Sequence, residues 1–290
     1  MATINTNVAA QVAANALAKN DRAMTQTMER LATGKRINSA SDDAAGLAIA
    51  SKLTSQVTGL NQAVRNGNDA ISMLQTADGA MIEVSNMLQR MRELSVQGGN
   101  GTLSTTDRAA LNTEFVALRT EIERIADNTQ WNGENLLDGS AGSFGLLTFQ
   151  VGYEADQTIT VNVGDLELAA GAVAYTAGTS AGGILGADLS AITITTAALS
   201  NTQVTALDVA IAGLDAKRAT IGSSLNVLEF AVDSLANASQ NASQARSRIA
   251  DADYATETTE LARTQIIAQA ATAMLSQANQ QTMSVMALLK

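Results

Sequence analysis

The residue types that carry most enzyme chemistry are missing from this chain. Its 290 residues include no His and no Cys, so the sequence offers neither an imidazole base nor a thiolate nucleophile. This excludes Ser-His-Asp and Cys-His catalysis, the usual zinc sites and disulfides. The acidic group whose spacing could suit a metal ion comprises Asp251, Asp253, Glu257 and Glu260. We interpret these carboxylates as solvated charges at a helix start, so the sequence predicts no enzyme, no cofactor and no metal site.

Composition also limits the partners of the chain. The net charge is −10 and the isoelectric point about 4.5, so no basic face is available for nucleic acid. No apolar run approaches the roughly 18 residues of a membrane span, which predicts no membrane insertion. Residues 1–20 lack the basic and apolar regions of a Sec signal peptide. We therefore expect either cytoplasmic residence or a dedicated export route without cleavage.

The elements that such a chain builds are long helices, because it contains no Pro. In residues 51–97, apolar side chains recur in steps of three and four, which places them on one helix face. That helix would measure roughly 65–70 Å, whereas a compact globule of this length would be about 50 Å across. We therefore predict an elongated protein with a role in assembly rather than catalysis.

The two ends of the chain predict helices with weaker apolar seams. Residues 1–35 carry one such seam and residues 255–289 another, and both consist mostly of small side chains. Isolated helices of this kind are marginal in water, so we expect them to order only against each other and against neighbouring molecules. The residues of this predicted polymerisation seam are Ile4, Val8, Val12, Leu261, Leu275, Val285 and Leu289. Ala16, Met24, Met28 and Leu31 continue the first series, and Ala268, Ala271 and Ala278 belong to the second.

Further helices are expected between these ends. Residues 34–43 interrupt the helical pattern, and Ser39 or Ser41 could cap the long helix that follows. A capping-box pattern at 104–107 opens a helix that reaches residue 128, and the short connection predicts antiparallel packing on the long helix. The helical period returns at 207–249, with Arg218 at the one position that lacks an apolar residue. These helices can pack as a bundle.

The period changes from 3.6 to 2 in the middle of the chain. Residues 147–151 and 159–163 each alternate apolar and polar side chains across a short polar link, which predicts a β-hairpin. Ile192 and Ile194 suggest one more strand within an otherwise irregular segment. The predicted fold is therefore mainly α: an elongated α-helical bundle or coiled coil with a β-hairpin and a short irregular central segment.

Several long motifs resemble those of bacterial flagellins, and they occur in the family's order. LATGKRINSASDDAAGLAIA, NQAVRNGNDAISMLQT and LQRMRELSVQ are similar to the flagellin N-terminal region, and SRIADADYA and ANQQTMSVMALLK to its C-terminus. The similarity covers roughly residues 1–165 and 200–290. It implies a domain D0 formed by 1–40 with 255–290 and a domain D1 formed by 41–165 with 200–250. Residues 166–199 would be a short variable surface excursion, which makes this a minimal flagellin without large outer domains.

The resemblance implies a structural subunit that self-assembles, through heterologous helix packing, into the bacterial flagellar filament used for motility. A hook–filament junction protein is the alternative, and the nearly complete N-terminal signature argues against it. Family members leave the cell unfolded and uncleaved through the flagellar type III export channel, so we expect a secreted, extracellular protein. The implied partners are copies of the chain itself, an export chaperone, and the cap and hook-junction proteins.

One surface is expected to carry contacts with other proteins. At 100° per residue, Arg90, Leu94 and Gln97 lie within about 60° of one another, and Leu94 lies about 100° from the centre of the apolar stripe. We therefore expect Leu94 to be at least partly exposed. In flagellins, residues matching Gln89, Arg90, Leu94, Gln97 and Glu114 belong to the surface recognised by the host receptor Toll-like receptor 5. We interpret subunit packing as the primary role of this surface and receptor recognition as a compatible second one.

Overall fold

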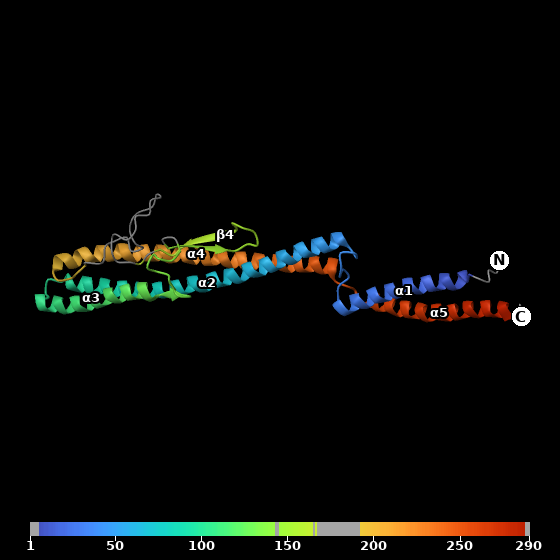
Figure 1. Cartoon of the computed structure of the whole chain (residues 1–290). Helices are drawn as coiled ribbons and strands as arrows, with labels where there is room; N and C mark the ends of the chain where they lie inside the picture. The colour runs from blue at the N-terminus through green and yellow to red at the C-terminus, as the bar shows by residue number, and fades with distance from the viewer. Residues whose placement is uncertain (1–5, 143–144, 165, 167–191, 288–290) are drawn as a thin grey trace. The chain divides into compact units, whose positions relative to one another are not determined.

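The computed structural model describes residues 6–142, 145–164, 166 and 192–287, with the backbone alone for 281–287. Helices dominate these residues, which confirms the mainly α prediction (Figure 1). They are α1 (Val8–Thr33), α2 (Ala44–Gly98), α3 (Thr105–Asn128), α4 (Ala197–Ala250) and α5 (Tyr254–Ala287). The chain divides into two compact units: unit 1 consists of Met1–Val57 and Gln240–Lys290, and unit 2 of Thr58–Ser239.

In unit 1, α1 and α5 lie side by side and run antiparallel (Figure 1). The antiparallel direction follows from three side-chain contacts along the pair. Asn7 bonds to the Ala278 carbonyl, Asn20 to the Thr264 carbonyl and Arg30 to the Glu257 carboxylate. The two ends of the chain therefore pair with each other, as the sequence predicted.

The seam between α1 and α5 repeats every 3.5 residues, as in a coiled coil. Its less exposed members are Ala10, Ala13, Leu17, Asn20, Met24, Thr27 and Leu31 on α1, and Glu257, Leu261, Thr264, Ala268, Ala271, Leu275 and Ala278 on α5. The seam predicted for α1 was partly wrong, because Val8 and Val12 are 58% and 63% exposed, and Ala16 and Met28 are exposed too. Steps of four residues advance by 400°, so a series such as Val8 and Val12 drifts around the helix, whereas alternating steps of three and four stay on one face.

The helix breaks of unit 1 are joined by backbone hydrogen bonds. Gly34, at φ 69°, ends α1 in the left-handed conformation that glycine adopts without a steric penalty. Lys35 then forms an antiparallel bridge with Asp251, which stands between α4 and α5. The Arg36 amide donates to the Ala250 carbonyl at 2.7 Å. This bridge fixes the C-terminal end of α1 beside the start of α5.

The cap of α2 differs from the prediction. Asp43 accepts the Gly46 amide with its carboxylate and the Leu47 amide with its carbonyl, so Asp43 is the N-cap and not Ser39 or Ser41. The carboxylate of Asp42 instead accepts the backbone amides of Asn38 and Ser39 and so closes the preceding loop. The serines lie too early in the chain because this loop occupies the residues up to Asp43.

In unit 2, α2, α3 and α4 pack around a common apolar core (Figure 1). Leu88 of α2, Phe115 of α3 and Leu214 of α4 are fully buried in it. The predicted capping box is present, since Ser104 and Asp107 each accept from the other's backbone amide. Arg218 pairs with Asp78 of α2 at 2.9 Å, which explains why a charged residue occupies an apolar position of the α4 series.

Two small antiparallel hairpins cover part of this core. Strands β1 (Gln130–Trp131) and β2 (Glu134–Asn135) flank a two-residue turn, and β3 (Leu146–Gln150) and β4 (Thr158–Asn162) form the larger hairpin. The predicted hairpin is therefore confirmed. The strand predicted at Ile192 and Ile194 is wrong: both side chains are buried, but the Ile194 amide bonds to the Asn112 side chain rather than to another strand.

Candidate assembly surfaces

The predicted contact surface on α2 and α3 is centred on Arg90. Its guanidinium pairs with Glu114 of α3 at 2.9 Å and with Glu93, one turn along α2, at 3.0 Å. The hydrogen bonds to Glu114 and then to Glu93 raise the pKa of Arg90 above its usual value. Gln89, Gln97 and Glu114 are exposed as well. The structure therefore brings four of the five predicted surface residues to one solvent-facing region.

Leu94, the fifth residue of the predicted contact surface, is not exposed. It is 1% exposed and belongs to the apolar core of unit 2. The expectation that Leu94 is at least partly exposed was therefore wrong. Both α3 and α4 pack on α2, and their contacts bury a wider arc than a single stripe. Leu94 thus supports the surface from beneath and cannot be one of its exposed contact residues.

The acidic residues near the α4–α5 junction serve the local structure. Asp253 accepts the Ala255 amide and the Thr256 hydroxyl and so caps α5. Glu257 pairs with Arg30 at 3.2 Å, and Glu260 pairs with Arg263 at 3.1 Å. Within the ranges that the structure describes, no three His, Cys, Asp or Glu residues are grouped closely enough to hold a metal ion.

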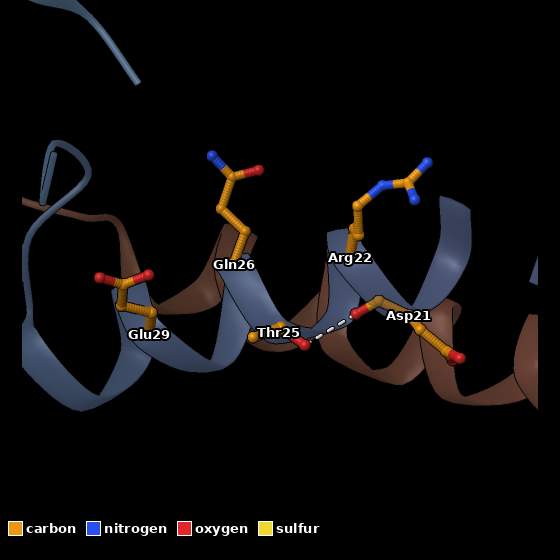
Figure 2. Close-up of a pocket in the computed structure, with 5 residues that line it drawn as sticks. All are labelled: Asp21, Arg22, Thr25, Gln26 and Glu29. Atoms are coloured by element: carbon orange, nitrogen blue, oxygen red, sulfur yellow. Dashed lines mark hydrogen bonds between the residues drawn. The ribbon is translucent and has the colours of Figure 1, made fainter. Parts of the chain in front are cut away.

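A surface depression on α1 offers little to a small molecule. Figure 2 shows its lining, which is Asp21, Arg22, Thr25, Gln26 and Glu29. All five side chains come from one helix, and the Thr25 hydroxyl is held by the Asp21 carbonyl at 2.8 Å. A ligand site normally needs walls from several elements. This depression is therefore a gap between neighbouring side chains on a helix surface.

The pairing of α1 with α5 leaves an apolar face of α5 uncovered. Ile266 and Met274 are strongly exposed, and Ile267 is exposed beside them. Small exposed residues continue this outer α5 face at Ala262, Ala270 and Ala273. Val8 and Val12 are exposed on α1 as well, so both helices of the pair carry apolar side chains that the chain itself leaves uncovered.

The structure places the predicted seam residues in different positions. Leu261 and Leu275 are half-buried in the seam with α1, whereas Val8 and Val12 face solvent. Ile4 and Leu289 lie outside the described residues, and at Val285 only the backbone is described.

A second exposed stripe of apolar and small side chains lies along α4 in unit 2. The sequence patterns above did not predict it. Phe230 is 75% exposed, and Val209 and Val227 are exposed on the same side of the helix. The outer α4 face consists of Val209, Ala212, Ala216, Ala219, Ser223, Val227, Phe230, Ser234 and Asn237. These residues are uncharged and recur in steps of three and four. That periodicity, opposite the buried series, was the signal that could have found this face.

Charge is divided unevenly between the units. Unit 1 contains ten Lys and Arg and eight Asp and Glu, so it is nearly balanced at +2. Unit 2 contains eight Lys and Arg and twenty Asp and Glu, so its net charge is −12. Close approach between copies is therefore easier through unit 1, or through faces of unit 2 that carry no charge.

The described helices include none with the length and apolar content to cross a bilayer. The bacterial flagellin N-terminal helical region matches residues 4–142, and the flagellin C-terminal helical region matches residues 204–289.

The chain is also similar in sequence to known flagellins and in fold to a solved flagellar protein. The chain is 42% identical to a flagellin of Halalkalibacterium halodurans over 287 residues, covering 99% of each chain. It is 39% identical to a flagellin of Bacillus subtilis, again covering 99% of each. A putative flagellar hook-associated protein of Vibrio parahaemolyticus shares its fold, with a TM-score of 0.59, 18% identity, and coverage of 72% of this chain and 100% of that one. The chain therefore belongs to the bacterial flagellins, structural proteins that self-assemble into the extracellular filament of the flagellum.

Proposed function

We propose that this flagellin polymerises through the faces that its internal helix pairing leaves open. The observation that carries the proposal is the outer α5 face, where Ile266 and Met274 stand exposed outside the seam with α1. Burying each such side chain contributes about 1.5–3 kcal/mol, so a contact between copies at this face would be favourable. Val8 and Val12 extend the polymerisation surface onto α1. Leu261 and Leu275 support it by holding the pair together.

The terminal helices also suit a growth step confined to the end of a filament. Ala and polar residues make up most of the seam between α1 and α5, so pairing buries little apolar area for each residue ordered. A pair of this kind gains stability when a neighbouring copy covers its outer faces. We propose that full ordering of α1 and α5 accompanies assembly, in a domain formed by residues 1–40 and 255–290. The rest of the long-helix bundle would form the second domain.

The outer α4 face supplies a second contact within unit 2. It lacks charge along its length, although unit 2 carries −12. Two copies can approach along such a face without bringing carboxylates together, and Phe230 is a large side chain of the type that anchors interfaces. We assign this face to lateral packing between copies. Different patches meeting in this way form a heterologous contact, which grows into a helical fibre rather than a closed ring.

The surface around Arg90 has a separate role in the proposal. The exposed residues Gln89, Arg90, Gln97 and Glu114 present a polar surface with one ion-paired Arg at its centre. We assign it to subunit packing and, in the free monomer, to recognition by a host receptor of the Toll-like receptor 5 type.

We further propose that the chain is exported without cleavage through the flagellar type III route. Its further partners would be an export chaperone and the cap and hook-junction proteins. The chain would catalyse no reaction.

Seeded elongation with purified monomer tests the polymerisation surface. The variant Ile266→Ser/Met274→Ser should add to filament fragments at least tenfold more slowly, because two apolar contacts are lost between copies. Gln265→Ser/Gln269→Ser changes exposed polar residues on a flank of the same helix and serves as the matched control. If both double variants elongated at the wild-type rate, the outer α5 face would have no part in assembly.

A further inference from the structure

A buried polar contact interrupts the apolar seam between α1 and α5. Asn20 is 9% exposed, and its side-chain amide donates to the Thr264 carbonyl at 2.8 Å. Thr264 is 2% exposed, and its hydroxyl bonds back to the Glu260 and Leu261 carbonyls. A buried amide in such a seam costs stability, but it can select one alignment of the two helices.

The apolar part of the seam distinguishes alignments poorly. Alanine occupies Ala10 and Ala13 on α1 and Ala268, Ala271 and Ala278 on α5. A slide of α5 by seven residues would again bring small side chains opposite one another, at Ala13 and Ala278 for example. It would also bring Leu17 toward Leu275. Packing volume alone therefore gives little preference for the observed alignment.

The Thr264 carbonyl differs from the carbonyls that a seven-residue slide would offer to Asn20. In a helix, the side chain four residues later leans back over a given carbonyl. Four residues after Thr264 comes Ala268, whose small side chain leaves the Thr264 carbonyl oxygen accessible. The heptad-related carbonyls belong to Glu257 and Ala271, and there the covering side chains are Leu261 and Leu275. Asn20 thus finds an open acceptor in one alignment, and its amide loses that partner in the shifted ones.

We propose that Asn20, together with the open carbonyl that Ala268 leaves at Thr264, selects the alignment of α1 against α5 along the seam and adds to the Lys35–Asp251 bridge that joins the adjoining ends of the two helices. Asn20 is a positioning residue: it selects which turns of the two helices meet and thereby fixes which outer residues are displayed together. The Arg30–Glu257 pair near the other end of the seam acts in the same direction, because a slide would separate the two charges. This inference rests on the pairing seen in unit 1, and it deepens the proposed function by stating what shapes the polymerisation surface.

The absence of Cys from the chain permits a direct test with introduced pairs. Ala13→Cys/Ala271→Cys reports the observed alignment, because these residues lie between the Asn7–Ala278 and Asn20–Thr264 contacts. Ala13→Cys/Ala278→Cys reports an alignment shifted by seven residues. Oxidation of dilute full-length monomer traps α1 and α5 in whichever alignment they pair, even when the pair forms only transiently. The ratio of shifted to native disulfide is then measured by mass spectrometry in the wild-type, Asn20→Leu, Asn20→Ala and Met24→Leu backgrounds.

The ratio should be well below one in the wild-type background and should rise about tenfold in Asn20→Leu and Asn20→Ala, since one buried hydrogen bond no longer opposes the slide. Met24→Leu replaces one apolar seam residue by another and should leave the ratio within about twofold. An unchanged ratio in both Asn20 variants would overturn the inference, as would a wild-type ratio near one. Seeded elongation of Asn20→Leu is a separate readout: a shifted alignment with normal elongation would count against the proposed polymerisation surface but not against the role of Asn20.

Discussion

Leu228 and Phe230 lie two positions apart on α4 and face opposite environments. Leu228 is fully buried in the core of unit 2, whereas Phe230 is 75% exposed. Two residues along a helix differ by 200° in direction, so one helix can contribute to a core and present an apolar outer face at the same time. This relationship separates the stability of the monomer from its assembly.

Replacing Phe230 should therefore affect assembly alone. We expect Phe230→Ala to slow seeded elongation at least tenfold while changing the free energy of unfolding of the monomer by less than about 0.5 kcal/mol, since the side chain has few partners within the chain. Leu228→Ala, the matched control, should destabilise the monomer by about 2–5 kcal/mol through the cavity that it leaves. Chemical denaturation and filament seeding measure the two effects. Normal elongation of Phe230→Ala would remove the outer α4 face from the assembly scheme.

At the surface around Arg90, effects on the stability of the monomer can likewise be separated from effects on binding. Leu94→Ala should cost about 2–5 kcal/mol of unfolding free energy, because the side chain is 1% exposed in the core. Arg90→Ala breaks ion pairs on an exposed surface, and such pairs contribute about 0–1 kcal/mol. In a receptor-binding assay with folded protein, we expect Arg90→Ala to weaken binding without loss of stability. If Leu94→Ala left the denaturation midpoint unchanged, the burial of Leu94 would be contradicted.

Three aspartates at helix and loop caps predict a loss of stability in acid. Hydrogen bonds hold the pKa of Asp107 below its ordinary value of 3.8, first from the Ser104 side chain and then from its backbone amide. The pKa values of Asp42 and Asp253 are lowered as well, chiefly by the Ser39 amide and by the Thr256 hydroxyl. A carboxyl whose pKa is depressed by folding contributes stability above the unfolded-state pKa and loses it as the pH falls through the folded-state pKa.

Unfolding free energy should therefore be insensitive to these groups from about pH 5 to 7 and should fall below about pH 4. Asp107→Asn keeps an acceptor for the capping box but removes the titration. We expect this variant to be slightly less stable than the wild type at about pH 6 and to approach the wild type near about pH 2. Urea denaturation across this pH range measures the difference. A constant difference throughout the range would show that the Asp107 charge contributes nothing.

The uneven charge of the two units predicts that growth depends on salt. Unit 2 carries −12, so neighbouring copies repel one another more strongly when the Debye length is about 30 Å, at about 0.01 M salt, than when it is about 8 Å, at about 0.15 M. Seeded elongation should therefore be faster at the higher salt concentration. Asp69→Asn/Asp127→Asn removes two exposed charges and should reduce the difference in elongation rate between the two salt concentrations. An equal salt dependence in the double variant would exclude general repulsion as the cause.

Methionine oxidation offers a footprint of the polymerisation surface. Met28 and Met274 are exposed, whereas Met81 and Met91 are fully buried. Dilute hydrogen peroxide should convert the first two to sulfoxides at least tenfold faster in the monomer, because the thioether must be reached by the oxidant. In filaments we expect Met274 to become protected. Peptide mapping by mass spectrometry measures both states, and equal oxidation of Met274 in monomer and filament would place this residue outside the interface.

Much of the fold follows from local patterns in the sequence. The helices appeared where apolar spacing of three and four met an absence of Pro, and the Ser104–Asp107 cap and the larger hairpin lay where their motifs indicated. The less successful predictions concern contacts. Ile192 and Ile194 alternate as a strand would, yet the Ile194 amide found the Asn112 side chain. Alternation shows that a segment has two faces, but not which partner accepts its backbone hydrogen bonds.

Burial on individual helix faces required the tertiary structure. Direction around a helix follows from residue number, so the sequence by itself placed Arg90 and Leu94 on neighbouring sides of α2. Whether a direction is exposed depends on how many helices pack there, and the joint packing of α3 and α4 on α2 buried Leu94. The same dependence turned Val8 and Val12 outward while Leu17 and Met24 met α5. Periodicity is a property of one helix, whereas exposure is a property of its neighbours, and only the folded arrangement supplies those.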